Sequence, residues 1–110
     1  MEISEAQEAV DKWIREVGKR YFSHLTNMAL LTEETGELAR LIARTYGDQV
    51  AKPGDIPHPG NAKEDIAEEL ADIFWVVVCL ANQTGIDLTA AFEASLRKKY
   101  SRDKNRFREA

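Results

Sequence analysis

The sequence predicts an all-α fold: a bundle of four main helices that associates with further copies of itself. Apolar residues recur at helical spacing in four segments, which glycine or proline separates. The only strand-like stretch, VVV at 76–78, lies inside a segment of helix length. With 110 residues, of which 44% are hydrophobic, the chain suffices for one core, so we expect a single domain over residues 1–110.

The first two helices are predicted from their starts and their apolar stripes. We expect the first over residues 5–19, because Ser4 and Gln7 have the spacing of a capping box ahead of an apolar stripe. We expect the second over residues 27–46, with Thr26 as its N-cap. Both should be amphipathic.

A proline- and glycine-rich loop separates the second helix from the third. Residues 47–61 hold all three prolines, and loops of this length in compact domains are usually functional or mobile, so we expect a lid. The third helix should run from a cap at Asn61 to about residue 84. Asp87 should cap the fourth helix, which continues into the C-terminal tail.

The third helix is apolar all round from residue 73 to residue 81, which indicates a helix buried on every side. A bundle of only four helices cannot cover one of its helices well on every side. We therefore expect the chain to associate with further copies of itself, as a homodimer or homotetramer. Cys79 lies in this run and is expected to be a buried thiol. Further residues expected to face the core are Trp13, Trp75, Leu88, Ala91, Phe92 and Leu96.

Two acidic motifs, EETGEL and EELADI, share the pattern Glu-Glu-x-x-acid-apolar. On a helix, residues three apart share a face, so Glu34 pairs with Glu37 and Glu69 pairs with Asp72. If the second and third helices pack antiparallel, the four carboxylates converge. Like charges about 4 Å apart repel by roughly 4 kcal/mol at an effective dielectric of about 20. Such a cluster must bind protons or cations.

A ligand set of carboxylate oxygens suits Mg²⁺ or Mn²⁺ and does not suit zinc. Asp72 opens the apolar run, where a metal ion would compensate its charge, whereas a purely solvated acidic face would not require an acid there. Gly36 inside a helix would allow a close approach. A di-iron site needs Glu-x-x-His pairs, and neither His24, expected to lie where a helix begins, nor His58 follows an acid at that spacing.

Charge is distributed unevenly along the chain. Residues 97–110 hold seven Lys or Arg against two acids, whereas the preceding residues hold eight against seventeen. The acidic body would repel a nucleic-acid backbone, so nucleic-acid binding through the tail is the less favoured interpretation. A small polyanion held between a metal ion and the tail fits both signs of charge.

The segments NMALLTEETGELARLIA, EELADIFWVVVCLANQTGIDL and KKYSRDKNRF together resemble the MazG-like nucleotide pyrophosphohydrolases, an all-α group. The resemblance covers residues 20–107. It implies cleavage of a nucleoside triphosphate, dNTP or NTP, between the α- and β-phosphates, with Mg²⁺, or Mn²⁺ in its place, as cofactor. Removal of noncanonical nucleotides would be one role for such an enzyme.

The resemblance also implies roles for individual residues. It makes Glu34, Glu37, Glu69 and Asp72 metal ligands, with Glu33 beside them in support or as a base that orients water. Trp13 and Trp75 would then be able to stack a base if they do not belong to the core. The chain departs from the family at Asp103, a position at which the family often has asparagine. The substrate-binding candidates are Asn27, Lys99, Arg102, Asp103, Lys104 and Arg106.

No apolar run reaches the length of a membrane span, and the N-terminus lacks the features of a signal peptide, so we expect a cytoplasmic protein without a membrane partner. A rival interpretation is a non-enzymatic interaction module, with surface acids and an apolar third helix that binds a partner. Loss of divalent-ion stabilisation in Asp72→Asn would separate the two interpretations.

Overall fold

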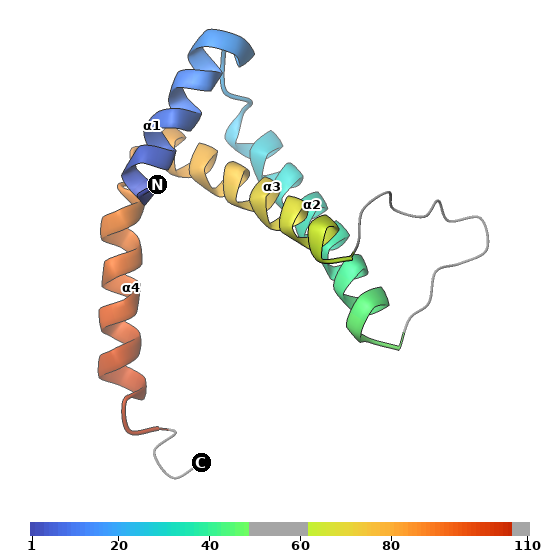
Figure 1. Ribbon diagram of the computed structural model, residues 1–110. Helices are drawn as coiled ribbons and strands as arrows, with labels where there is room; N and C mark the ends of the chain where they lie inside the picture. Colours follow the sequence, from blue (N-terminus) through green and yellow to red (C-terminus); the bar gives the residue numbers. More distant parts are fainter. Residues whose placement is uncertain (49–61, 107–110) are drawn as a thin grey trace, which may run out of the picture.

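Every regular element in the part of the chain that the structure describes is helical. The computed structural model describes residues 1–48 and 62–106. Helix α1 spans Ile3–Trp13 and continues into a π-helical turn, Ile14–Gly18; α2 spans His24–Tyr46, α3 spans Ala62–Gln83 and α4 spans Leu88–Asp103 (Figure 1). The all-α prediction is confirmed. The predicted lid from residue 49 onward and the predicted cap at Asn61 lie outside the described residues.

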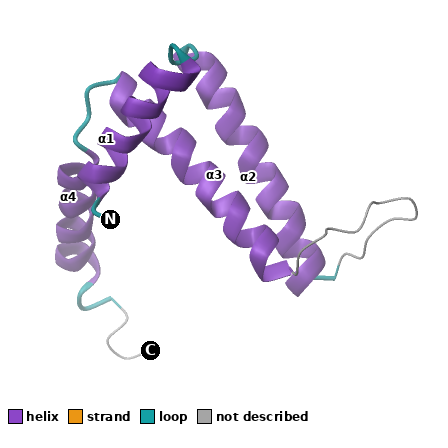
Figure 2. Ribbon diagram, turned by 45° about the horizontal axis from the view of Figure 1, so that its top comes forward, coloured by secondary structure: helices purple, strands orange, loops and turns teal. Residues whose placement is uncertain are grey.

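Helices α2 and α3 lie side by side and run antiparallel, as the metal-site prediction required (Figures 1 and 2). Helix α1 packs across α3, and α4 leaves the end of α3 at an angle of 106°. The described helices therefore form a V, with α2 and α3 in one arm and α4 as the other (Figure 1). No single helix of the described chain is long and apolar enough to cross a membrane.

The core lies where α1 crosses α3. Val10 and Ile14 pack against Val78 and Cys79, all four are buried, and Tyr21 and Leu88 pack against this cluster from the outside. Burial of each such aliphatic side chain contributes about 1.5–3 kcal/mol. The prediction that Cys79 is buried is confirmed.

Helix α1 begins earlier than its sequence predicts. The N-cap is Glu2, whose backbone N–H donates to the Glu5 carboxylate at 3.2 Å, so the Ser4–Gln7 capping box is wrong. Gln7 instead bonds to residues at the far end of α3. The helix ends in a π-helical turn, and Lys19 follows with a φ of 74°, a left-handed conformation that costs a non-glycine residue energy.

The other helix ends are close to their predicted positions. Helix α2 begins at His24, as expected for that residue, because the Ser23 hydroxyl accepts from the Thr26 backbone N–H at 3.1 Å; Thr26 is therefore not the N-cap. Gly85 has a φ of 70° in the turn after α3, where glycine is favoured. Asp87 caps α4, as predicted, by accepting from the Ala90 N–H at 3.2 Å.

Several residues predicted to face the core are open to solvent in the single chain. Helix α4 has no buried residue, and Phe92 and Leu96 are 53% and 41% exposed. Ala91 is exposed as well, and only Leu88 contacts the core. The α3 segment expected to be buried all round leaves Phe74 at 45% and Trp75 at 38% exposed. For α4 the expectation fails in the single chain because this helix points away from the α2–α3 pair. Burial of α3 on every side was expected only together with further copies of the chain, and it stays a prediction.

Candidate active site

Three carboxylates meet at the seam between α2 and α3. Glu34 and Glu37 come from one face of α2 and Glu69 comes from α3, and one oxygen of each lies within 4.8 Å of the others. The spacing of three residues on α2 aligns its two acids, and the antiparallel packing brings the third across. The predicted convergence therefore holds for three of the four acids.

Burial and mutual repulsion destabilise the charged forms of the carboxylates in this cluster. The Oε2 atoms of Glu34 and Glu69 are buried without a hydrogen-bond partner. Burial, followed by the hydrogen-bonding and repulsive effects of Glu34 and Glu37, raises the pKa of Glu69 to about 8. An unsatisfied buried carboxylate oxygen costs free energy, which either a proton or a cation relieves.

These residues fit a hard divalent cation. Mg²⁺ and Mn²⁺ prefer oxygen ligands, and the cluster supplies carboxylate oxygens that lack protein partners. No cysteine or histidine belongs to this group of described residues, which disfavours zinc. The arrangement thus has the ligand chemistry of a magnesium or manganese site.

The fourth predicted ligand stands apart from this group. Asp72 lies three residues after Glu69 on α3, but it is exposed and is not among the mutually close carboxylates. In the single chain its side chain is open to solvent, so the role of Asp72 as a compensated metal ligand stays a prediction. Glu33 is exposed beside the cluster on α2, and an ideal Cβ on Gly36 would meet nothing within 4 Å.

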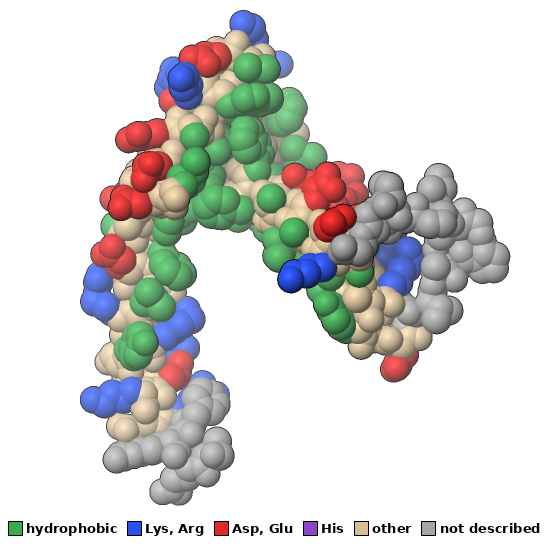
Figure 3. Space-filling model, in the orientation of Figure 1, with side chains coloured by type: hydrophobic (Ala, Val, Ile, Leu, Met, Phe, Trp, Pro, Cys, Tyr) green, Lys and Arg blue, Asp and Glu red, His purple; other side chains and the backbone are tan. Residues whose placement is uncertain are grey.

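The basic tail residues lie at the far end of α4. Figure 3 shows one group of acidic side chains on the α2–α3 arm and others on the side where α1 lies, while Lys and Arg recur along the lower part of the other arm. Arg102 donates to both carboxylate oxygens of Asp103, at 2.9 and 2.8 Å, and Arg106 lies 3.5 Å from the same carboxylate. Lys99 donates to Ser95 at 2.7 Å, and Lys104 is exposed. Within the described residues of one chain, the tail cations and the acidic cluster therefore lie apart.

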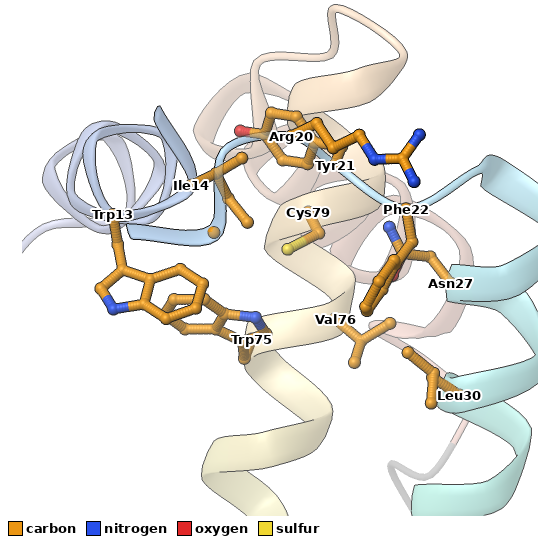
Figure 4. Close-up of a pocket in the computed structure, with 11 residues that line it drawn as sticks. Trp13, Ile14, Arg20, Tyr21, Phe22, Asn27, Leu30, Trp75, Val76 and Cys79 are labelled. Atoms are coloured by element: carbon orange, nitrogen blue, oxygen red, sulfur yellow. The ribbon is translucent and has the colours of Figure 1, made fainter. Parts of the chain in front are cut away.

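An aromatic cavity of about 200 Å³ opens between α1, the connection to α2, and the α2–α3 pair (Figure 4). Trp13 and Trp75 meet edge to face in its wall, with ring centroids 5.2 Å apart and planes at 84°. Trp13 is 45% exposed, so neither tryptophan is a fully buried core residue. The remaining lining residues are Ile14, Gly18, Arg20, Tyr21, Phe22, Asn27, Leu30, Val76 and Cys79.

Asn27 is the buried polar group of this cavity. Its side chain is 4% exposed, and its Nδ2 donates to Oε1 of Gln83 at 2.7 Å. Gln83 in turn donates through Nε2 to the carbonyl of Phe22 at 2.5 Å. This chain of bonds fixes the orientation of both amides, so Asn27 is held rigidly in the cavity wall.

The cavity and the carboxylates share one seam. Asn27, Leu30, Glu34 and Glu37 follow one another at helical spacing on one face of α2. Asn27 and Glu34 are seven residues apart, which is about 10 Å along the helix axis. A ligand with a flat aromatic part and a polyanionic part has both partners within this distance.

Sequence reasoning missed the connections among the polar residues around the cavity. Tyr21 donates to Asp11 at 2.7 Å and accepts from Asn82 at 3.1 Å. Burial and then the bond to Asp11 raise the pKa of Tyr21, while the bonds from Arg15 and Tyr21 lower the pKa of Asp11. The only sequence signal was a pair of amides, NQ, placed directly after the apolar run.

Comparisons with known proteins identify similar sequences and similar structures. The MazG nucleotide pyrophosphohydrolase domain matches residues 22–107. YpjD of Bacillus subtilis strain 168 is 39% identical over 108 residues, which cover 96% of this chain and 89% of YpjD.

Two crystal structures are similar to this chain. That of YpjD has a TM-score of 0.75 and 36% identity, and the match covers 94% of this chain and 97% of that one. That of the Bacillus-conserved MazG protein, a nucleotide pyrophosphohydrolase, has a TM-score of 0.73 and 36% identity, with 96% of each chain covered.

Proposed function

Because the chain belongs to the MazG nucleotide pyrophosphohydrolase family, we propose that it hydrolyses nucleoside triphosphates between the α- and β-phosphates, with Mg²⁺ as cofactor and Mn²⁺ as a substitute. The products are a nucleoside monophosphate and pyrophosphate. The observation that carries the proposal is the carboxylate cluster with two buried oxygens that lack partners. Noncanonical nucleotides are the proposed substrate group.

Glu34, Glu37 and Glu69 would hold the metal, and Asp72, one turn further along α3, would complete the set by turning inward. When bound, Mg²⁺ supplies Lewis acidity toward phosphate oxygens and neutralises their charge. Water attacks the α-phosphorus, and the bond to the bridging oxygen of the β-phosphate breaks. Glu33, exposed beside the cluster, accepts the proton from the attacking water.

The cavity is the proposed site of the base. Its aromatic walls would bury a flat heterocycle, and the fixed amide of Asn27 would read a polar edge. The spacing of about 10 Å between Asn27 and Glu34, two helical turns, leaves room for the sugar between base and phosphates. Because the ring of Trp75 lies in the cavity wall, this residue is assigned to base binding.

We propose that the tail cations reach the phosphates from a second copy of the chain. Phe92, Leu96 and Tyr100 recur every four residues on α4 and are 53%, 41% and 73% exposed, so they form an apolar stripe. Leu70 and Phe74 form a second exposed stripe on α3, at 52% and 45%. Pairing these stripes between copies would cover both and would bring basic tails toward acidic clusters.

The reaction is tested by incubating the protein with a panel of NTPs and dNTPs plus Mg²⁺ or Mn²⁺ and identifying the phosphorus products by ³¹P NMR. Monophosphate and pyrophosphate should form with the unchanged protein and with Glu68→Gln, an exposed neighbour of the cluster. Glu37→Gln should abolish both products. No turnover of any nucleotide would reject the proposal and favour a non-enzymatic interaction module.

Mixing two inactive variants tests whether the tail acts between copies. One variant carries Glu69→Gln; the other carries Lys99→Ala and Arg102→Ala. A mixed dimer contains one site with intact acids and an intact tail from the other chain, so random exchange should restore about one quarter of full activity. If acids and tail of the same chain worked together, mixing would restore nothing, and the shared site would be rejected.

A further inference from the structure

Among the described residues, helix α4 packs against the rest of the chain at its beginning. None of its residues is buried, and Leu88 at its start is the residue that packs against the core. Its packing contacts are with α1, whereas its distal half projects away from α2 and α3 (Figures 1 and 2). The direction of the helix is therefore set at the corner where α3 ends and α4 begins.

A single side chain of α1 binds all parts of this corner. Nε2 of Gln7 donates to Oδ1 of Asn82 at 3.0 Å and to the carbonyl of Ile86 at 3.0 Å. Oε1 of Gln7 accepts from the backbone N–H of Leu88, the first residue of α4, at 3.0 Å. The end of α3, the turn and the start of α4 thus share one anchor.

Asn82 is itself held from several sides. Its Nδ2 donates to the backbone carbonyl of Gln7 at 3.0 Å and to the hydroxyl of Tyr21 at 3.1 Å. With its Oδ1 accepting from Gln7, the amide is fully oriented and cannot rotate without losing bonds. The anchor is consequently rigid, and through Tyr21 it joins the wall of the aromatic cavity.

We infer that Gln7 is a positioning residue for the reaction: it fixes the angle of α4 and thereby the place at which the tail cations meet the substrate. This inference rests on the proposed function for its effect on catalysis. Sixteen residues of α4 make a lever about 24 Å long, so a rotation of about 10° at the corner moves its end by about 4 Å. That displacement exceeds the length of a hydrogen bond, so Arg102 would lose its ligand.

The test combines a distance measurement with kinetics on the full chain. Spin labels are attached to cysteines introduced at two exposed positions, Lys63→Cys on α3 and Ser101→Cys near the end of α4. Double electron–electron resonance then measures the distance between the labels, which reports the angle between α3 and α4. Labelled chains are diluted with unlabelled ones. Gln7→Leu removes the anchor at similar volume. Gln7→Glu keeps the acceptor for Leu88 and loses both donors. Glu8→Leu, on the exposed side of α1, is the matched control.

Gln7→Leu should broaden the distance distribution by several ångströms and lower kcat/KM about tenfold or more, with helix content unchanged. Gln7→Glu should fall between it and the unchanged protein, and Glu8→Leu should match the unchanged protein in both readouts. An unaltered distribution in Gln7→Leu overturns the inference, as does a broad distribution with full activity. If the unchanged protein hydrolyses no nucleotide, the proposed function fails, and the distance result alone still decides whether Gln7 sets the angle.

Discussion

Replacing Glu69 by glutamine should change how the stability of the metal-free protein depends on pH. The pKa of Glu69 in the folded chain is raised from 4.5 to about 8. Between these two values the unfolded chain has released the proton and the folded chain still holds it. The folded state therefore loses stability as pH rises from about 4.5 to 8, and the loss is complete above that range.

The full rise in pKa corresponds to at most about 5 kcal/mol, since each pH unit contributes about 1.4 kcal/mol. Glu69 is partly open to water, so solvent screening reduces the expected loss to about 2–3 kcal/mol. Glutamine has no proton to lose, and Glu69→Gln should remove this part of the pH dependence.

The assay is urea unfolding followed by circular dichroism between pH 5 and pH 9 in EDTA. The difference in unfolding free energy between the unchanged protein and Glu69→Gln gives the contribution of the Glu69 carboxyl group at each pH. Glu68→Gln, exposed on the same helix, is the matched control. Adding Mg²⁺ at pH 8.5 should recover stability only where Glu69 is present. Equal pH profiles for the unchanged protein and Glu69→Gln would refute the electrostatic account of the cluster.

Three further predictions concern other side chains. Glu34→Gln should abolish the increase in melting temperature that Mg²⁺ gives, whereas retention of the full increase would remove Glu34 from the ligand set. Tyr21→Phe deletes two hydrogen bonds and should lower the unfolding free energy by about 1–2 kcal/mol in urea; no loss would contradict the network around Asn82. Asp103→Asn frees the neighbouring guanidinium and should lower KM severalfold without raising kcat, and an unchanged KM would argue against tail contacts with phosphate.

The sequence predicted elements well where local chemistry decides them. Asp87 before an amphipathic segment gives a cap, and Gly85 supplies the left-handed conformation that ends the preceding turn. The pairing of Glu34, Glu37 and Glu69 followed from helical spacing together with antiparallel packing. These features depend on residues that are close in sequence or on one long helix pair.

Features that depend on tertiary contacts were not predictable. Two residue pairs have the spacing of a capping box, Ser4 with Gln7 and Glu2 with Glu5. The structure uses the second pair, because the side chain of Gln7 hydrogen-bonds to Asn82 at the α3–α4 corner. The π-helical turn shifts the register after Trp13. Val17 is therefore 59% exposed, although regular α-helical spacing would place it on the same face as Val10 and Ile14.

The site was therefore predictable only in part. Asp72 directly precedes the apolar run. Whether its side chain faces the cluster or the solvent depends on which face of α3 packs against α2, and helical periodicity did not decide this. The separation of Lys99 and Arg102 from the acids depends on the angle of 106° at the α3–α4 corner, which no local motif encodes. The roles of these three residues stay predictions.

The π-helical turn places Gly18 next to the indole ring of Trp13. An ideal Cβ at this position would lie 3.0 Å from Cζ3 of Trp13, closer than such atoms normally approach. A side chain at position 18 would require the indole ring to give way by a few tenths of an ångström, in a cavity wall that both residues form. A single methyl group would thus change the shape of the cavity wall through van der Waals contact with Trp13. If the cavity holds the base, as proposed, relatives that differ at this position should select heterocycles of different shape by steric exclusion.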